Sequence, residues 1–240
     1  MGLAEVRAYL RKRFSKEETV GLYLAVGFLV CITLAVGLGL LALEIAAVTT
    51  RPEPFDRVVG GFLARIRSPE LTRLLRAMTF LGDHRFLLVA TPLVSAGLLL
   101  GGHRVSALLF SGSVVGGFGL NSALKIALAR ARPDLWPALV EEKTYSFPSG
   151  HAAMSTVFVG GLVAVVFRLR RRRSDRIAAL IVGIVWVAGV SASRIYLGAH
   201  WATDTVAGVL LGLFWVTVYA TGTEYLSRRA TRLRKSARPR

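Results

Sequence analysis

The chain has 240 residues, of which 53% are hydrophobic and 19% charged, and its mean hydropathy is +0.53. This composition excludes a disordered chain, whose hydrophobicity would be low, and argues against a water-soluble domain, whose surface needs more charge. The 31 Lys and Arg residues outnumber 14 Asp and Glu residues, for a net charge of +17, a bias typical of the cytoplasmic ends of membrane proteins. The single cysteine, Cys31, excludes an intrachain disulfide and a thiolate metal cluster.

Six apolar runs are candidates for helices that cross the roughly 30 Å hydrocarbon layer, which takes about 20 residues each. They are residues 20–43, 86–102, 105–124, 152–167, 177–193 and 205–223. The first run follows a basic segment, but it is too long for a signal peptide and no small-residue cleavage site follows it. The shorter runs are expected to extend into flanking polar residues or to sit where the bilayer thins. We therefore predict an all-α polytopic membrane protein, a single domain over residues 1–240.

The segment between the first two spans, residues 50–84, carries six arginines together with apolar residues at helical spacing. The apolar residues are Val58, Val59, Phe62, Leu63 and Ile66. This pattern predicts an amphipathic helix that lies on the outer membrane interface with its arginines toward the lipid headgroups.

The distribution of charge predicts the orientation of the bundle. With six crossings, both termini share one side with the turn at Arg104 and the loop 168–176, and these segments hold 19 of the 31 basic residues but 5 of the 14 acidic ones. The positive-inside rule places that side in the cytoplasm. The basic tracts 170–173 and 228–240 are interpreted as topology signals that contact anionic lipid, not nucleic acid.

Glycines recur at helical spacing in two predicted spans. They are Gly112, Gly116, Gly119, Gly208 and Gly212. Small residues at such spacing let helices approach closely, so we expect all five to serve helix packing.

Costly polar residues gather at the extracytoplasmic ends of the predicted spans. They are Lys125, Arg132, Ser149, Gly150, His151, Ser193, Arg194, His200 and Asp204. Ionisable groups at membrane depth are expensive and are usually functional. Taken singly, each has an ordinary structural interpretation, such as a helix cap or a solvated residue at the interface. We give that interpretation to His84 and His103. Their convergence on one side indicates a site.

The spacing of these residues has a chemical meaning. Lys125 and Arg132 are seven residues apart, so a helix would present both cations on one face before Pro133 ends it. Ser149 and Gly150 precede the fourth predicted span, whose free N–H groups favour an anion. These features predict an anion site.

His200 and Asp204 are four residues apart and so are expected to be neighbours on one helical face. A carboxylate beside an imidazole fixes its tautomer and raises its basicity, as in nucleophilic and general-base pairs. Pure anion binding needs cations but no activated nucleophile, so the pair favours an enzyme over a carrier.

Together these blocks resemble the three-part motif of the type 2 phosphatidic acid phosphatase family. The blocks are Lys125-x6-Arg132-Pro133, Pro148-Ser149-Gly150-His151 and Ser193-Arg194-x5-His200-x3-Asp204. The resemblance covers residues 125–204, about a third of the chain. The family belongs to a superfamily shared with bacterial acid phosphatases and vanadium haloperoxidases.

The resemblance implies a role for each motif residue. His200 would be the nucleophile that becomes a phosphohistidine, Asp204 would orient it, and His151 would protonate the leaving oxygen. The residues that would hold the phosphoryl oxygens are Lys125, Arg132, Arg194, Ser149 and the backbone of Gly150. The scheme implies no metal and no other cofactor.

We therefore expect a membrane phosphatase that acts on a lipid phosphate or diphosphate at the extracytoplasmic face. Undecaprenyl diphosphate, phosphatidylglycerophosphate and phosphatidate are the candidate substrates. The bacterial members of the family with a similar size and layout favour the first two, and the residues indicate neither the physiological substrate nor the oligomeric state. The alternatives are a phosphotransferase or a vanadate-dependent haloperoxidase of the same superfamily, or a non-catalytic lipid-phosphate transporter or binder. Six spans argue against the haloperoxidase, whose chemistry requires no access to lipid.

Overall fold

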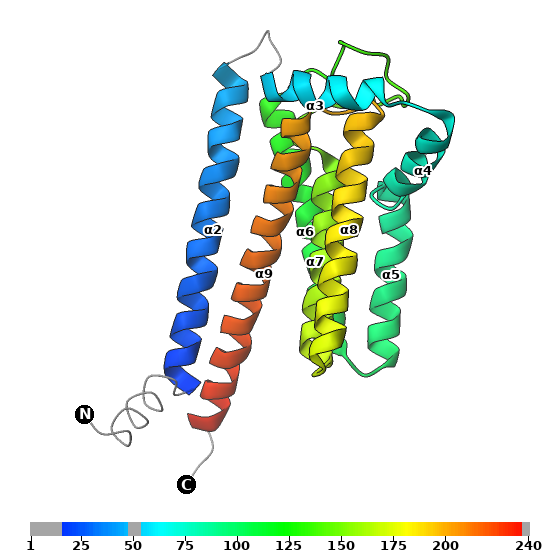
Figure 1. Cartoon of the computed structure of the whole chain (residues 1–240). Coiled ribbons are helices and arrows are strands. Elements are labelled where there is room, and N and C mark those ends of the chain that lie inside the picture. Colours follow the sequence, from blue (N-terminus) through cyan, green and yellow to red (C-terminus); the bar gives the residue numbers. More distant parts are fainter. Residues whose placement is uncertain (1–15, 48–53, 237–240) are drawn as a thin grey trace, which may run out of the picture.

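The computed structural model describes residues 16–47 and 54–236, and within these residues all regular secondary structure is helical (Figure 1). The helices are α2 (Lys16–Ala47), α3 (Pro54–Arg65), α4 (Pro69–Phe80), α5 (His84–Leu100), α6 (Arg104–Leu128), α7 (Gly150–Leu169), α8 (Arg173–Tyr196) and α9 (Ala202–Ser236). The predicted basic N-terminal segment and the last residues of the basic tail lie outside the described residues. The predicted all-α fold is confirmed.

Within the described residues, five helices are long and apolar enough to cross a membrane unaided. They are α2 (through Ala25–Ile45), α6, α7, α8 and α9 (through Ala202–Gly222). The predicted 86–102 span falls on α5, whose 17 residues cover only about 26 Å at 1.5 Å per residue. Helices α4 and α5, which are bent by 48° to one another, meet the same length and hydropathy criteria only when they are taken together, so counting the pair as one broken span gives six.

The segment 54–80 forms two helices where the sequence predicts one amphipathic helix. Ser68 caps α4 through its side chain and Pro69 begins that helix, so the chain breaks between Arg65 and Pro69. Helix α3 lies across one end of the bundle (Figure 1). Its buried residues are Asp56 and Gly60, whereas its exposed face carries apolar side chains such as Val58, which is 71% exposed.

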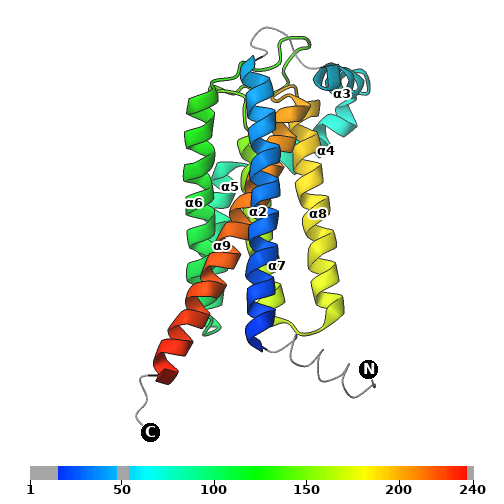
Figure 2. The ribbon, with the colours of Figure 1, turned by 90° about the vertical axis from the view of Figure 1, so that its left-hand side faces the viewer.

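The core lies around α7, which packs against α6, α8 and α9. Phe110 of α6 and Phe158 of α7 meet edge to face there, among other buried apolar side chains. Helix α2 stands at the edge of the bundle and packs along α9, as both views show (Figure 2).

Glycines let α7 and α9 approach closely at the end of the bundle that carries the motif residues. A Cβ at Gly208 would lie 2.6 Å from the carbonyl oxygen of Ser149, and one at Gly212 would lie 2.5 Å from Cβ of Thr156. Gly112 and Gly116 meet the side chains of α9 instead. The packing role predicted for Gly119 is wrong, because this residue faces away from its neighbours and a Cβ there would meet nothing within 4 Å.

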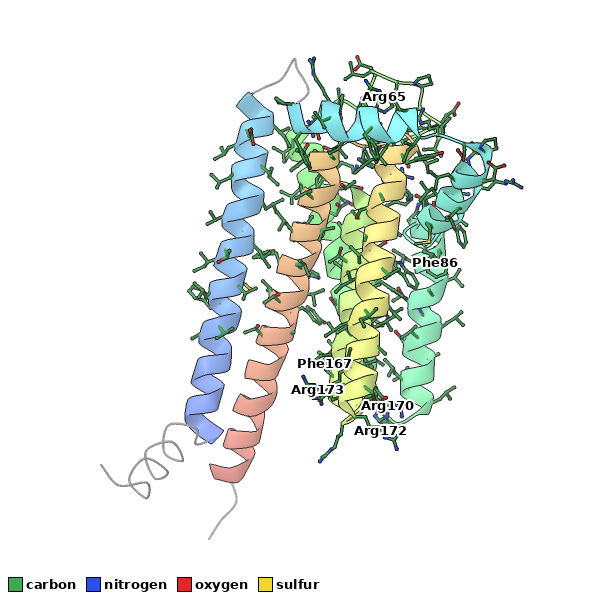
Figure 3. All side chains as sticks on the ribbon, in the orientation of Figure 1. Arg65, Phe86, Phe167, Arg170, Arg172 and Arg173 are labelled. Carbon is green, nitrogen blue, oxygen red and sulfur yellow. The ribbon has the colours of Figure 1, made fainter. Side chains whose placement is uncertain are left out.

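The two ends of the bundle differ in character. One end holds the start of α2, the last described turn of α9, and the loop between α7 and α8 with Arg170, Arg172 and Arg173 (Figure 3). The other end holds α3 and the loop 129–149 (Figure 1). The predicted grouping of segments therefore recurs in the fold, with the motif residues at the end opposite the arginine tract.

Replacing Gly208 with alanine is expected to lower the free energy of unfolding by about 1–3 kcal/mol, the usual cost of overpacking. The added methyl group would meet backbone atoms of Ser149 and Ala153, which cannot rotate away as a side chain would. A thermal unfolding scan of the protein in detergent measures the change. The matched control is Gly119→Ala, for which the unfolding midpoint should stay level or rise; equal losses in both variants would contradict the packing argument.

Candidate active site

His200 and Asp204 form a buried pair at the motif end of the bundle. His200 Nδ1 lies 3.4 Å from Asp204 Oδ2, and the two residues are 1% and 0% exposed. The prediction that both lie on one helical face is wrong, because α9 begins at Ala202, after His200. Instead, a tight turn after α8 brings them together: the backbone N–H groups of Ala199 and His200 both donate to the carbonyl of Arg194.

The surroundings of His200 set its protonation. Burial lowers the pKa of its imidazole to about 4, with Arg194 and Arg132 adding to the drop and Asp204 opposing it. The ring is therefore neutral at pH 7. Arg132 Nη1 lies 3.4 Å from Nε2, and since a guanidinium can only donate, Nε2 must be the acceptor and Nδ1 must carry the proton toward Asp204. The lone pair of Nε2 thus faces the cations.

Asp204 is held by partners that the sequence motif did not reveal. Its Oδ2 accepts the backbone N–H of Trp201 at 2.9 Å and the hydroxyl of Ser146. Its Oδ1 accepts Nη1 of Arg130 at 2.5 Å, and Nη2 of the same guanidinium lies 2.8 Å from Oδ2 of Asp56 on α3. Asp56 stands 74 residues from Arg130 in the sequence, so no local pattern could have joined them.

Two motif arginines meet at one carboxylate. Arg194, which is 2% exposed, donates to Oγ1 of Thr79 at 2.9 Å and to Oε1 of Glu142. The other oxygen of Glu142 lies 3.8 Å from Nη2 of Arg132. A carboxylate shared by two guanidinium groups marks a position where an anion is stabilised. The sequence motif does not include Glu142.

Arg132 reaches this position from a loop rather than from a helix. Helix α6 ends at Leu128, because Ala129 adopts the left-handed conformation with φ 43°, so the predicted two-turn helical spacing of Lys125 and Arg132 is wrong. Arg132 is fixed by the carbonyls of Thr144 and Ala199, at 2.7 and 2.5 Å. Lys125, still on α6, donates to the carbonyl of Tyr145 at 2.5 Å and lines a cavity of about 610 Å³ together with Arg132.

The start of α7 contributes the remaining motif residues. The side chain of Ser149 caps the helix by accepting the N–H of Ala152, and its own backbone N–H donates to the carbonyl of Asp204 at 3.0 Å. Next to it, Gly150 leaves so little room that a Cβ would lie 3.3 Å from the amide of Asn121. The motif segment 148–151 is thus seated directly on the first turn of α9.

His151 has a carboxylate partner of its own. Its Nε2 lies 3.9 Å from Oδ2 of Asp83, the residue that caps α5 at the break after α4. His151 is also within electrostatic range of His200 and Arg194. Gly82 permits this arrangement, because a Cβ there would lie 2.7 Å from Oγ of Ser155. The sequence interpretation passed over Asp83, since an acidic residue at a helix start is ordinarily a cap.

The eight predicted site residues therefore lie at one end of the bundle. They are Lys125, Arg132, Ser149, Gly150, His151, Arg194, His200 and Asp204. Direct contacts join Arg132, His200 and Asp204 in one row, and Glu142 links Arg194 to that row. The arrangement places the neutral imidazole of His200 beside a group of cations, with a second histidine, His151, at the same end of the bundle.

Comparison with known families and proteins identifies the family of this chain. The family model of the PAP2 superfamily matches residues 104–228. Phosphatidylglycerophosphatase B of Bacillus subtilis (strain 168) is 32% identical over 172 residues, which is 69% of this chain and 82% of that protein. Phosphatidylglycerophosphatase B of Escherichia coli (strain K12) is 41% identical over 66 residues, which is 28% of this chain and 24% of that protein.

Solved structures give the same answer for the fold. The crystal structure of a transmembrane PAP2 type phosphatidylglycerolphosphate phosphatase from Bacillus subtilis matches with a TM-score of 0.74 and 28% identity, over 81% of this chain and 96% of that chain. The crystal structure of LpxE from Aquifex aeolicus matches with a TM-score of 0.53 and 18% identity, over 68% and 91%, and shares the fold. The family match covers more than half of the chain, and we conclude that this protein belongs to the type 2 phosphatidic acid phosphatase (PAP2) family and is a membrane lipid phosphatase.

Proposed function

We propose that this protein hydrolyses the phosphate monoester of phosphatidylglycerophosphate through a phosphohistidine on His200. The observation that carries the proposal is the neutral imidazole of His200, whose Nδ1 faces Asp204 and whose Nε2 faces Arg132. The choice of lipid is supported by the relatives from Bacillus subtilis and Escherichia coli, which are both phosphatidylglycerophosphatases. Undecaprenyl diphosphate and phosphatidate are the competing substrates.

In the proposed reaction the phosphoryl oxygens occupy the position of the Glu142 carboxylate between Arg132 and Arg194. Nε2 of His200 attacks phosphorus, the P–N bond forms, and the P–O bond to the glycerol oxygen breaks. His151 gives its proton to that oxygen. Water then gives a proton to His151 as its oxygen attacks phosphorus, the P–N bond breaks with the electron pair returning to Nε2 of His200, and inorganic phosphate leaves. Most of the rate gain would come from positioned charge, as expected for phosphoryl transfer.

The lipid would enter from the side of the bundle. The cavity of about 610 Å³ is bounded by Lys125 and Ile126 of α6 and by residues 143–145. Ile126 is 73% exposed, so an apolar surface that faces lipid leads directly to the cations. Acyl chains can stay in the bilayer while the headgroup reaches His200. A second cavity of about 360 Å³, which shares Arg132 and Glu142 with the first, offers a separate route for phosphate.

We place the site on the extracytoplasmic side, with both chain ends in the cytoplasm. The support is the positive-inside rule: the arginine tract lies at the end of the bundle opposite α3 (Figure 3). The exposed apolar face of α3 would then rest in the outer membrane interface.

Removal of the nucleophile tests this proposal. The His200→Ala variant in detergent should release inorganic phosphate from phosphatidylglycerophosphate at least about 10³-fold more slowly, because an imidazole that forms the covalent intermediate cannot be bypassed. The assay runs without added divalent metal, and phosphatidate and undecaprenyl diphosphate serve as competing substrates. Unchanged turnover in the variant would refute the phosphohistidine route.

The matched control for that assay is His103→Ala, a histidine at the opposite end of the bundle, and its activity should equal that of the natural protein.

The same phosphate-release assay tests on which side of the membrane the site lies. Right-side-out vesicles should hydrolyse an added short-chain substrate without permeabilisation, whereas inverted vesicles should need detergent. The reverse pattern would overturn the proposed orientation.

The acid limb of the activity profile should reflect His200. Its pKa of about 4 means that protons inactivate the free enzyme only as the pH falls toward 4, because protonation removes the lone pair that attacks phosphorus. The measurement is kcat/KM between pH 3.5 and 7, divided by the ionised fraction of the substrate. If kcat/KM, after this division, falls with a midpoint near the ordinary histidine pKa of about 6.5, the result contradicts a buried, neutral imidazole.

Glu142 should compete with anions for the arginines. In Glu142→Gln the guanidinium groups lose a charged partner, so vanadate and inorganic phosphate should inhibit about tenfold more strongly, consistent with the loss of one charge-assisted hydrogen bond. Inhibition constants measured beside those of Glu141→Gln, its exposed neighbour, separate this effect from a general loss of negative charge. Weaker inhibition in Glu142→Gln would mean that the carboxylate helps to bind phosphate.

A further inference from the structure

Two buried carboxylates share one guanidinium behind the nucleophile. Nη1 of Arg130 lies 2.5 Å from Oδ1 of Asp204, and Nη2 lies 2.8 Å from Oδ2 of Asp56. Both aspartates are 0% exposed, and the side chain of Arg130 is 12% exposed. The row continues from Asp204 to Nδ1 of His200.

The second carboxylate oxygen of Asp56, Oδ1, also accepts hydrogen bonds. Its Oδ1 accepts the backbone N–H of Thr203 at 2.8 Å and the hydroxyl of Thr203 at 3.0 Å. Asp56 therefore holds both Arg130 and the start of α9, where it binds Thr203, the residue before Asp204. Since α3 carries Asp56, an element that contributes no motif residue reaches the back of the catalytic pair.

The charges of Asp56, Arg130 and Asp204 do not cancel. Two carboxylates against one guanidinium leave one negative charge, and the reaction needs that charge at His200 when the ring becomes cationic as a phosphohistidine. Without Asp56, the full charge of Arg130 would act on Asp204 and weaken its support of the imidazole. Without Arg130, two carboxylates would stay buried with no cation between them, which is strongly unfavourable.

We infer that Asp56 is a positioning residue for this phosphatase, which acts through Arg130 on Asp204 and so on the nucleophile. This inference rests on the proposed role of His200. Asp56 itself lines neither cavity, whereas its partner Arg130 borders the larger one. Removal of the Asp56 carboxylate should therefore affect the chemical step more than substrate binding.

A double-mutant cycle tests the inference. Asp56→Asn should lower kcat by about 10- to 100-fold, the range found for residues whose hydrogen bonds orient a metal-binding side chain. KM and the vanadate inhibition constant should stay within twofold. Arg130→Gln should lower kcat as well, and adding Asp56→Asn to it should cause little further loss, because the guanidinium path from Asp56 to Asp204 is already cut and only the bonds of Asp56 to Thr203 remain. Asp134→Asn, an exposed carboxylate on the loop 129–149, is the control for charge alone.

Two outcomes would overturn the inference: unchanged kcat in folded Asp56→Asn, or equal kcat losses from Asp56→Asn with and without Arg130. If Asp56→Asn fails to fold, Arg130→Lys replaces it, since an ammonium group keeps the charge but cannot span both carboxylates. It should lower kcat at an unchanged KM, and full kcat would count against the inference. Failure of the proposed function is distinguishable, because it would appear as activity in His200→Ala.

Discussion

An ionised carboxylate with no access to water is the constraint around which this active site is built. Asp204 is 0% exposed, and a buried charge is tolerated only with paired charge and hydrogen bonds. The chain meets this need from two regions: the loop 129–149 supplies the guanidinium of Arg130 and the hydroxyl of Ser146, and the turn before α9 supplies the backbone N–H of Trp201. Satisfying one carboxylate therefore joins elements that are far apart in sequence, and the same bonds orient His200.

The arginines of the site are likewise held by hydrogen bonds and by an opposite charge. Arg132 and Arg194 are not left bare at the end of a membrane bundle but are paired with backbone carbonyls, a hydroxyl and Glu142. Anion affinity at such a site is the difference between two pairings, one with Glu142 and one with the ligand. A phosphate has more charge and more acceptor oxygens than a carboxylate, so it is suited to displace Glu142 from the two arginines.

Close helix packing serves the same site. Because Gly208 has no side chain, α7 can rest on α9 where the motif segment begins. That contact lets the backbone of Ser149 donate to the carbonyl of Asp204, so the segment 148–151 and the His200–Asp204 pair are held against one another. The packing predicted for Gly208 thus also supports the geometry of the candidate site.

The sequence by itself determined the membrane-spanning helical class, because long apolar runs have few other stable states. It also identified the motif residues, because cations and histidines at membrane depth are costly. Only the tertiary structure decided that α6 ends at Leu128, since Ala129 turns left-handed there, and that residues 54–80 form two helices. Only the tertiary structure joined Asp56, Arg130 and Asp83 to the two histidines. Charge pairing acts through space, and no periodicity along the chain records which buried carboxylate a distant guanidinium will meet.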